Sequence, residues 1–257
     1  MKKNANVCYI KKIDKFSLQN KIAVQEAAQE IACMFPRRIP SEIVAELPMA
    51  SYKGDIVLVN SEEEAQSAVL EISKETLLGF DTESRPSFKK GFSYPVSILQ
   101  IGGAEKVWIF RLANIGSAIE KVFSILENPV IKKVGVAVNG DIANLKALRD
   151  FTPAGFEDIS VKTRQVGIVN TGLRNLLSLF TGLRISKSAQ MSNWAAEELS
   201  KKQISYAATD AWASRILYLE VEKLFEHGYV LEPEKPREDK RGIVRRFFEK
   251  LRSKFWC

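Results

Sequence analysis

Short apolar runs, each bounded by polar or glycine-containing breaks, follow one another in the middle of the chain. The β-rich run at 55–59 leads into Ser61 and Glu64, and this spacing of Ser and Glu predicts a helix that extends to about Ser73. Three further β-like segments occupy residues 76–81, 95–101 and 106–110. Because their connections are short, we expect an antiparallel meander.

The pattern then changes to an alternation of strand and helix. Helices are predicted at 115–126 and 142–149, on either side of a β-branched strand at 130–138. Beyond residue 170 apolar residues recur at three- and four-residue spacings, which predicts helix almost throughout. The helical stretches there are 173–180, 194–199 and 203–225. We therefore expect an α/β fold with a mixed central sheet, an antiparallel meander plus a parallel strand, flanked by helices.

Composition divides the chain of 257 residues into three predicted parts. Residues 1–53 form an N-terminal extension, with a short Ala-rich helix at 22–33 followed by a Pro-containing arm. Residues 54–230 form the regular domain, and residues 231–257 form a basic tail. The 46% hydrophobic and 27% charged residues are ordinary for a globular protein, which excludes collagen-like and low-complexity classes.

Most of the net charge of +7 comes from the two ends of the chain. Residues 1–40 carry 8 basic and 3 acidic side chains and residues 235–257 carry 9 and 3, whereas residues 41–234 carry 21 and 25. Such basicity favours polyanionic partners, although the central domain does not supply it. The pattern of apolar and basic residues at 243–256 predicts an amphipathic basic helix. Three roles are open for it: it folds back or docks on a partner protein, it binds nucleic acid, or it lies on an anionic membrane surface.

The chain has one histidine, His227, and three widely spaced cysteines. A single imidazole excludes His-rich zinc sites and two-His iron sites, so we expect carboxylates to carry any catalytic chemistry. The odd number and the spacing of the cysteines argue against a disulfide framework and fit a reducing compartment. No signal peptide and no run of about 18 apolar residues is evident, so we expect a cytoplasmic protein without a transmembrane segment.

Two carboxylates follow the apolar strand that begins at Leu77. Asp81 and Glu83 are two residues apart, so on a strand both side chains project from the same face. Two ionised carboxylates so placed repel each other unless a cation lies between them. Taken alone, the pair is read more simply as a strand that runs out into a solvated turn.

Two further acidic motifs lie later in the chain. Asp141 follows the β-branched strand at the start of a helix, where capping and the helix dipole by themselves favour an acid. Tyr206 and Asp210, four residues apart, share one face of a long helix. Ala207 and Ala211 allow that helix to pack closely against a sheet. Each motif alone is compatible with a purely structural role.

Together, the segments 80–83, 134–145 and 206–211 resemble the three exonuclease motifs of the DEDD 3′-to-5′ exonuclease superfamily, tyrosine subclass. Within it, the sequence is similar to the Werner-syndrome exonuclease domain and the ribonuclease D group over about residues 54–227. The resemblance implies a ribonuclease H-like fold. It also implies metal-dependent hydrolysis of phosphodiester bonds from a single-stranded 3′ end of DNA or RNA, with release of nucleoside 5′-monophosphates.

The resemblance further implies a role for each motif residue. Asp81, Glu83, Asp141 and Asp210 would bind two divalent ions, Mg²⁺ or Mn²⁺, with Asp81 bridging both. Glu83 and Asp210 would complete the site that activates water, and Asp141 would help to hold the second ion. Tyr206 would orient the attacking water as a neutral phenol.

The loop at 84–91 departs from the family pattern, since it lacks the tryptophan of the Werner-type domain. It offers cationic side chains for phosphates and an aromatic ring for stacking on a base, and a solvated basic loop is an equal alternative. The matching segment around residues 187–194 is also expected to contact substrate. The predicted substrate-binding residues are Arg85, Phe88, Lys89, Lys187 and Trp194.

Two functions of different classes remain open for such a chain. One is an active exonuclease, and the other is a catalytically silent nucleic-acid-binding scaffold of the same fold, because a fold does not guarantee activity. The presence of all five motif residues favours the enzyme. DNA and RNA stay equal alternatives as substrate, because discrimination depends on contacts with the 2′-hydroxyl group.

Overall fold

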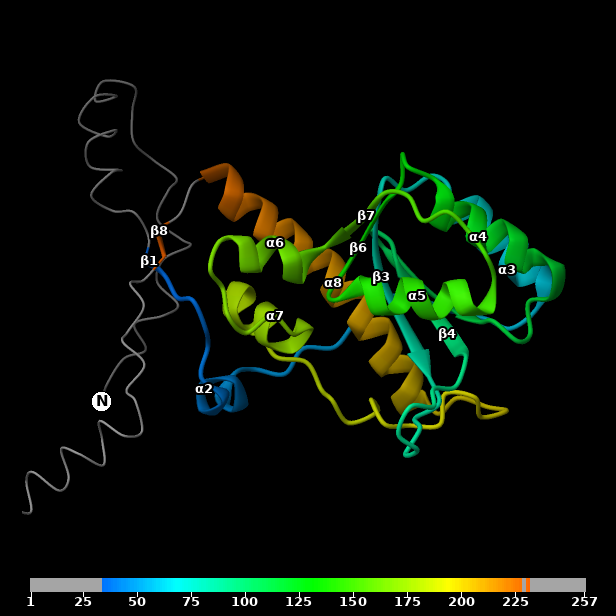
Figure 1. Cartoon of the computed structure of the whole chain (residues 1–257), viewed down its shortest axis with the longest axis horizontal. Helices are drawn as coiled ribbons and strands as arrows, with labels where there is room; N and C mark the ends of the chain where they lie inside the picture. The colour runs from blue at the N-terminus through cyan, green and yellow to red at the C-terminus, as the bar shows by residue number, and fades with distance from the viewer. Residues whose placement is uncertain (1–33, 228–229, 232–257) are drawn as a thin grey trace, which may run out of the picture.

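A mixed sheet of six strands forms the centre of the structure and carries helices on both faces (Figure 1). The computed structural model describes residues 34–227 and 230–231. The strands lie in the order β2-β5-β4-β3-β6-β7 across the sheet. Their bounds are β2 Asp55–Val59, β3 Leu77–Ser84, β4 Val96–Gly102, β5 Lys106–Arg111, β6 Lys132–Gly135 and β7 Phe156–Asp158. The predicted α/β fold with a mixed central sheet is confirmed.

Strands β3, β4 and β5 form the antiparallel meander that the sequence predicts. Strands β2, β6 and β7 extend it in parallel pairings, β2 beside β5, β6 beside β3 and β7 beside β6. Parallel neighbours need long crossover connections. The parallel neighbours β6 and β7 are joined by a connection that contains α5 (Val138–Leu148). The chain returns from β5 across the sheet to β6 through η1 (Gly116–Ala118) and α4 (Ile119–Glu127).

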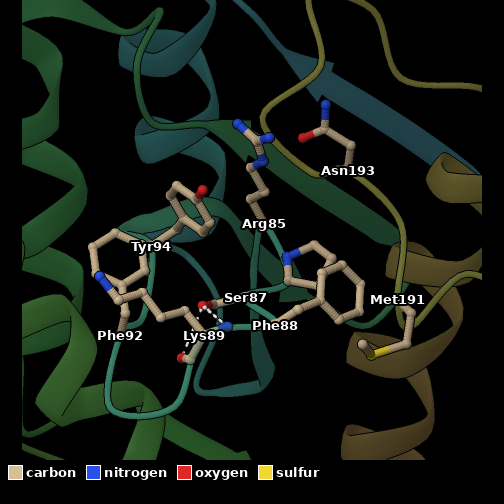
Figure 2. Close-up of a pocket in the computed structure, with 9 residues that line it drawn as sticks. Arg85, Ser87, Phe88, Lys89, Phe92, Tyr94, Met191 and Asn193 are labelled. Atoms are coloured by element: carbon tan, nitrogen blue, oxygen red, sulfur yellow. Dashed lines mark hydrogen bonds between the residues drawn. The ribbon is translucent and has the colours of Figure 1, made fainter.

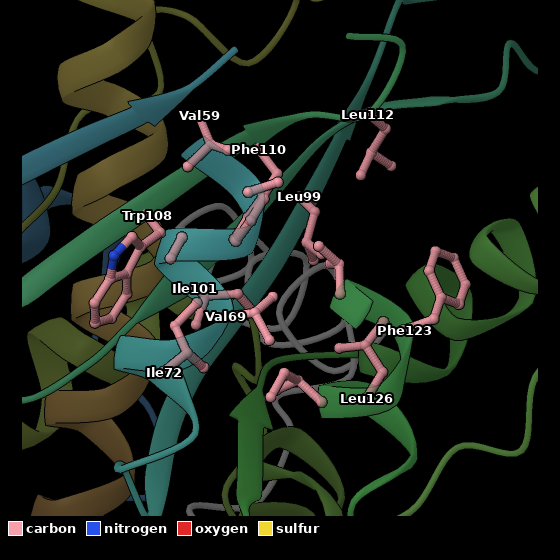
Figure 3. Close-up of a cluster of buried hydrophobic side chains, with 14 of the residues drawn as sticks. Val59, Val69, Ile72, Leu99, Ile101, Trp108, Phe110, Leu112, Phe123 and Leu126 are labelled. Atoms are coloured by element: carbon pink, nitrogen blue, oxygen red, sulfur yellow. The ribbon is translucent and has the colours of Figure 1, made fainter. Parts of the chain in front are cut away.

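Helices α3 (Glu62–Ile72) and α4 cover one face of the sheet. The α3 helix begins after Ser61, whose hydroxyl accepts a hydrogen bond from the Glu64 backbone N–H at 3.2 Å, as the capping pattern predicts. Figure 3 shows the apolar cluster between these helices and the sheet. Burial of each large apolar side chain there stabilises the fold by about 1.5–3 kcal/mol. The cluster includes Val69, Ile72, Leu99, Ile101, Trp108, Phe110, Phe123 and Leu126.

Helix α8 (Lys201–His227) lies against the other face of the sheet. The contact is close because β3 and β4 present glycines to it. A Cβ atom added at Gly79 would lie 1.9 Å from the Ala211 carbonyl oxygen, and one at Gly102 would lie 3.0 Å from the same oxygen. The alanines of α8 at this contact are fully buried, as the sequence predicts. The backbone of α8 therefore rests directly on the strand that carries the first acidic motif.

A sharp turn joins β6 to α5. Ala137 adopts the left-handed conformation, with φ of +62°, and its N–H donates to the Asp158 carboxylate at 3.0 Å. This turn ends the strand at Gly135 and starts the helix at Val138, so the strand is shorter and the helix begins earlier than predicted. Asp141 accordingly lies in the first turn of α5.

The helix predicted at 194–199 is wrong, because that segment contains turns and bends between α7 (Leu173–Thr181) and α8. Side chains satisfy its backbone instead. The side-chain carbonyl oxygen of Asn193 accepts a hydrogen bond from the backbone N–H of Ala195 at 3.2 Å. The Ser200 hydroxyl caps the start of α8. The apolar spacing in this segment reflects a buried Trp194 rather than a helical face.

Several short elements were not predicted from the sequence. They are α2 (Ser41–Glu46), β7, α6 (Ile159–Gln165) and a parallel pair formed by β1 (Met34–Phe35) and β8 (Val230–Leu231). The helices predicted at 22–33 and 243–256 lie outside the described residues, and the three-part division of the chain stays a prediction. No helix in the described part of the chain is long and apolar enough to cross a membrane.

Candidate active site

The end of β3 presents the first two acids toward α8. Asp81 pairs with Gln100 of β4 in the antiparallel register and Glu83 pairs with Ile98, a residue that packs against α8. Side chains directly opposite each other in such a pair share a face of the sheet. Asp81 also accepts a hydrogen bond from the backbone N–H of Thr82 at 2.9 Å, which limits its rotation. Both acids thus lie on the face that α8 covers, as their spacing predicts.

Helix α8 brings the third motif to the same place. Tyr206 and Asp210 lie one turn apart, and their side chains form a hydrogen bond with each other. Asp210 is only 6% exposed, between alanines that are themselves fully buried. The close approach of the helix at Gly79 holds Asp210 beside Asp81, because any side chain at Gly79 would push α8 away.

Asp141 approaches the end of β3 from the opposite face of the sheet. Its carboxylate accepts a hydrogen bond of 2.5 Å from the hydroxyl group of Thr82, which lies between the two acids of β3. The charge of Asp141 nevertheless reaches both of them, since it raises the pKa of Asp81 and of Glu83. The structure therefore gathers all four acids around the end of one strand.

The four carboxylates destabilise one another's ionised forms. Burial, followed by repulsion from Asp210 and Asp141, raises the pKa of Glu83 to about 8. Burial raises the pKa of Asp210 to about 7, against the hydrogen bond from Tyr206. Burial and the three neighbouring acids raise the pKa of Asp81 well above its usual range. None of the ion pairs between described residues includes any of these four acids.

This donor set fits a hard divalent cation in its chemistry. Clustered carboxylate oxygens without a cationic side-chain partner are the environment that Mg²⁺ and Mn²⁺ prefer. The arrangement does not form a closed coordination shell, since no three His, Cys, Asp or Glu side chains of the described residues lie close enough together to hold one ion. Asp141 is hydrogen-bonded to Thr82 in this arrangement.

Tyr206 keeps its proton throughout the ordinary pH range. Burial and the neighbouring Asp210 and Glu83 charges raise its pKa, because all of them disfavour a phenolate. The hydroxyl group is therefore available as a neutral donor or acceptor beside the carboxylates. For Tyr206 to act as a phenolate base its pKa would have to be lowered, whereas its surroundings raise it.

An open pocket of about 580 Å³ begins where β3 runs out into the loop before β4 (Figure 2). Arg85 follows Glu83 by two residues, and the opposite wall comes from Met191 and Asn193, about a hundred residues away in sequence. The lining residues are Arg85, Pro86, Ser87, Phe88, Lys89, Phe92, Tyr94, Met191 and Asn193. The structure thus brings the predicted residues Arg85, Phe88 and Lys89 together in one pocket.

The pocket combines a fixed aromatic wall with a free aromatic ring. The Arg85 guanidinium lies 4.8 Å from the centroid of the Tyr94 ring, which also packs edge to face on Phe92 at 4.9 Å. Phe88, by contrast, is 90% exposed, and Met191 is 64% exposed beside it (Figure 2). The two exposed apolar side chains leave their surfaces available to a planar group.

The other two predicted substrate-binding residues lie elsewhere. Lys187 is exposed in the segment between α7 and α8 and does not line the pocket. Trp194 is fully buried, so the prediction that it contacts substrate is corrected. Its indole packs against the Tyr206 ring instead, with the ring centroids 5.9 Å apart. The sequence did not indicate whether Trp194 faces the core or the solvent, because the surrounding segment has no regular period.

Sequence reasoning missed two polar residues beside Asp81, namely Thr82 on β3 and Gln100 on β4. Thr82 holds Asp141 through its hydroxyl group. Gln100, opposite Asp81, is fully buried, and neither its amide nitrogen nor its amide oxygen has a hydrogen-bond partner among the described residues. A lone amide in the apolar run of β4 was the available signal, because a buried polar side chain is costly unless it has a partner.

A mixed six-stranded sheet with acids gathered at the end of its central strand places the protein in the ribonuclease H-like class. The chain belongs to the 3′-5′ exonuclease family, whose model matches residues 56–226. Its membership in this family agrees with the resemblance that the three acidic motifs carry. The matched region contains every acid of the site and Tyr206.

Comparison with characterised relatives supports the same family. The bifunctional 3′-5′ exonuclease/ATP-dependent helicase WRN of Mus musculus is 29% identical over 224 residues, which cover 83% of this chain and 16% of the relative. Ribonuclease D of Gluconacetobacter diazotrophicus is 29% identical over 178 residues, covering 68% of this chain and 44% of the relative. The chain thus spans less than half the length of these relatives.

Solved structures show the same fold. The Nibbler EXO domain of Aedes aegypti superposes with a TM-score of 0.62 at 22% identity, over 70% of this chain and 95% of that one. Escherichia coli RNase D, described as an exoribonuclease involved in structured RNA processing, gives 0.59 at 17% identity, over 77% of this chain and 50% of that one. The ribonuclease H-like fold is therefore confirmed.

Proposed function

We propose that the protein is a metal-dependent 3′-to-5′ exonuclease that hydrolyses phosphodiester bonds of DNA or RNA and releases nucleoside 5′-monophosphates. The observation that carries this proposal is the convergence of four carboxylates and one phenol at the end of β3. These acids repel one another and have no cationic partner among the described ion pairs. A bound cation relieves that repulsion, which gives the cluster a chemical purpose.

Asp81, Glu83, Asp141 and Asp210 are the residues that would hold two ions of Mg²⁺ or Mn²⁺. Such ions, when bound, lower the pKa of water and stabilise the negative charge that develops on the leaving oxygen. The chain itself contributes the neutral hydroxyl group of Tyr206, hydrogen-bonded to Asp210, which orients a water molecule at the scissile phosphate.

The pocket at the end of β3 accounts for recognition of a single-stranded end. Phe88 and Met191 offer exposed apolar surfaces on which an unpaired base can stack. Arg85 and Lys89 supply positive charge for the phosphates of the same strand. Stacking of this kind tolerates every base, so we expect little sequence preference and substrates with a free, unpaired 3′ end.

The test uses single-stranded and double-stranded DNA and RNA, each labelled either at the 5′ or at the 3′ end. With Mg²⁺ or Mn²⁺ the 5′-labelled strand should shorten progressively, and the 3′-labelled strand should release a mononucleotide at once. Asp81→Asn should lower kcat by a factor on the order of a thousand, because metal-assisted charge stabilisation is worth several kilocalories per mole. Chelation of the metal should have the same effect.

The matched control is Asp150→Asn, which removes an exposed aspartate after α5 and should leave the rate unchanged. Binding of the oligonucleotide without any metal-dependent shortening would contradict the enzyme and indicate a silent nucleic-acid-binding scaffold. Shortening from the 5′ end, or full activity in Asp81→Asn, would contradict the proposed site.

A further inference from the structure

Trp194 packs directly on the tyrosine of the proposed active site. Its side chain is fully buried, and its ring centroid lies 5.9 Å from that of Tyr206, with the two ring planes inclined at 43°. Tyr206 itself is partly exposed, so the surrounding protein does not enclose its ring completely. The indole packs against the phenol ring and so restricts its rotation.

Hydrogen bonds to Gln203 hold the segment that carries Trp194 on both sides of that residue. The Gln203 amide nitrogen donates to the Asn193 carbonyl oxygen at 3.1 Å, immediately before Trp194. Gln203 and Ser200 also cap the start of α8, because the Ser200 hydroxyl and N–H both donate to the Gln203 amide oxygen. This cap ties the segment to the same helix turn that leads into Tyr206.

The same segment is also hydrogen-bonded to the sheet. The Arg111 guanidinium at the end of β5 donates to the Ala196 carbonyl oxygen at 2.5 Å and to that of Glu197. The segment without regular secondary structure is therefore anchored to both the sheet and α8. The backbone on either side of Trp194 cannot move away from Tyr206 without breaking hydrogen bonds whose partners lie on two different elements.

The position of the Tyr206 ring decides where its hydroxyl group points. The hydrogen bond to Asp210 fixes only the far end of the side chain, whereas the indole contact restrains the ring itself. A displacement of a catalytic group by about 1 Å can cost a factor on the order of a hundred in rate. A residue that removes one ring orientation is therefore able to act on kcat without touching the substrate.

We propose that Trp194 is a positioning residue that holds the Tyr206 phenol toward the carboxylates. The inference rests on the proposed exonuclease function and assigns Trp194 a role different from substrate contact. It follows from full burial, from the ring contact and from the hydrogen bonds that anchor the surrounding segment. A Trp194 variant should act through the Tyr206 hydroxyl, and only through it.

A double-mutant cycle measures that dependence. Trp194→Leu should lower kcat by roughly tenfold to a hundredfold, and Trp194→Phe, which keeps a ring, should recover part of the loss. In a Tyr206→Phe background, which lacks the hydroxyl group, the same substitutions should change kcat by less than about twofold. If Trp194→Leu does not fold, Trp194→Phe alone completes the cycle.

The matched control is Phe123→Leu, which truncates another fully buried aromatic ring, packed on Phe151 and remote from α8. It should lower thermal stability and change kcat equally in both Tyr206 backgrounds. Equal losses for the Trp194 variants in both backgrounds would overturn the positioning role and leave the exonuclease function intact. Absence of metal-dependent cleavage by the wild-type protein would instead contradict the function.

A second measurement does not depend on activity. In protein labelled with 3-fluorotyrosine, the two orientations of a restrained ring give separate fluorine resonances, and the Tyr206 signal is assigned by its loss in Tyr206→Phe. The wild-type protein should show one dominant orientation, whereas Trp194→Phe should populate both. An unchanged population ratio in Trp194→Phe would overturn the proposal even if the protein cleaves no substrate.

Discussion

At the scale of single residues, Phe88 is distinctive because a large apolar ring stands 90% exposed at the edge of a pocket. Its neighbours Arg85 and Tyr94 satisfy each other through a cation–π contact at 4.8 Å, but the structure describes no ring contact for Phe88. Scattered exposed apolar residues are normal, so exposure alone proves little. Exposure of a large ring in a pocket that also holds Arg85 and Lys89 is stronger evidence for a contact with substrate.

We expect Phe88→Ala to weaken binding of a single-stranded oligonucleotide at least about fivefold, because one base stacked on an aromatic ring is worth about 1–3 kcal/mol. Fluorescence anisotropy in an Asp81→Asn background measures the affinity without degradation of the ligand. Leu70→Ala, which removes a 70% exposed side chain of α3, is the control and should leave the affinity unchanged. Equal affinities of Phe88→Ala and its parent would remove Phe88 from the substrate path.

The individual site residues differ in how far the sequence defines them. The motif spacing was sufficient to place Asp81 and Glu83 on one face of a strand, because side chains alternate along a strand. That this strand meets the helix of Asp210 followed only from the resemblance to the exonuclease motifs. The burial of Trp194 was not predictable, because an aromatic residue in an irregular segment has no period to indicate its direction. The pocket was only half predictable, since Met191 reaches it from a distant part of the chain.

At the scale of elements, the contact between β3 and α8 decides the geometry of the site. Asp81 and Asp210 face each other only because the helix backbone rests on Gly79. Small residues on both elements make that approach possible, and a methyl group in the contact has no space. The site therefore depends on a packing detail of two elements as much as on its own side chains.

Gly79→Ala should lower the free energy of unfolding by about 2–3 kcal/mol, because its Cβ would lie 1.9 Å from the Ala211 carbonyl oxygen and overpack the contact. It should also lower kcat, since α8 carries Asp210. Gly140→Ala is the control, because a Cβ there meets nothing within 4 Å and alanine stabilises a helix by about 0.5–1 kcal/mol. Urea unfolding measures the free energy of unfolding of both variants. Similar values for the two variants would contradict the role of the close approach.

The elements also show where sequence patterns stop being informative. Capping chemistry located the start of α3, because Ser61 and Glu64 act over three residues. The start of α5 was misplaced because Ala137 turns the chain in a left-handed conformation that non-glycine residues seldom adopt. Strand β7 has three residues and α6 has seven, which are too short for a period to be recognised.

At the scale of the whole molecule, the acid cluster links protonation to folding. Glu83 has a pKa of about 8 in the folded protein and Asp210 one of about 7, whereas carboxyl groups in an unfolded chain titrate near 4. Between these values the folded state keeps protons that the unfolded state has released. The metal-free protein should therefore lose stability as the pH rises from about 4 to about 8.

Thermal unfolding in the presence of a chelator, followed by circular dichroism across this range, tests the linkage. The melting temperature should fall as the pH rises, and Glu83→Gln should reduce the fall because it removes one carboxyl group of raised pKa. Glu226→Gln, at an exposed position of α8, is the control and should keep the wild-type slope. Excess Mg²⁺ should restore more stability at about pH 8 than at about pH 5, because the ionised carboxylates bind it better. A melting temperature that rises with pH in the chelator would show that the four acids do not oppose one another in the folded protein.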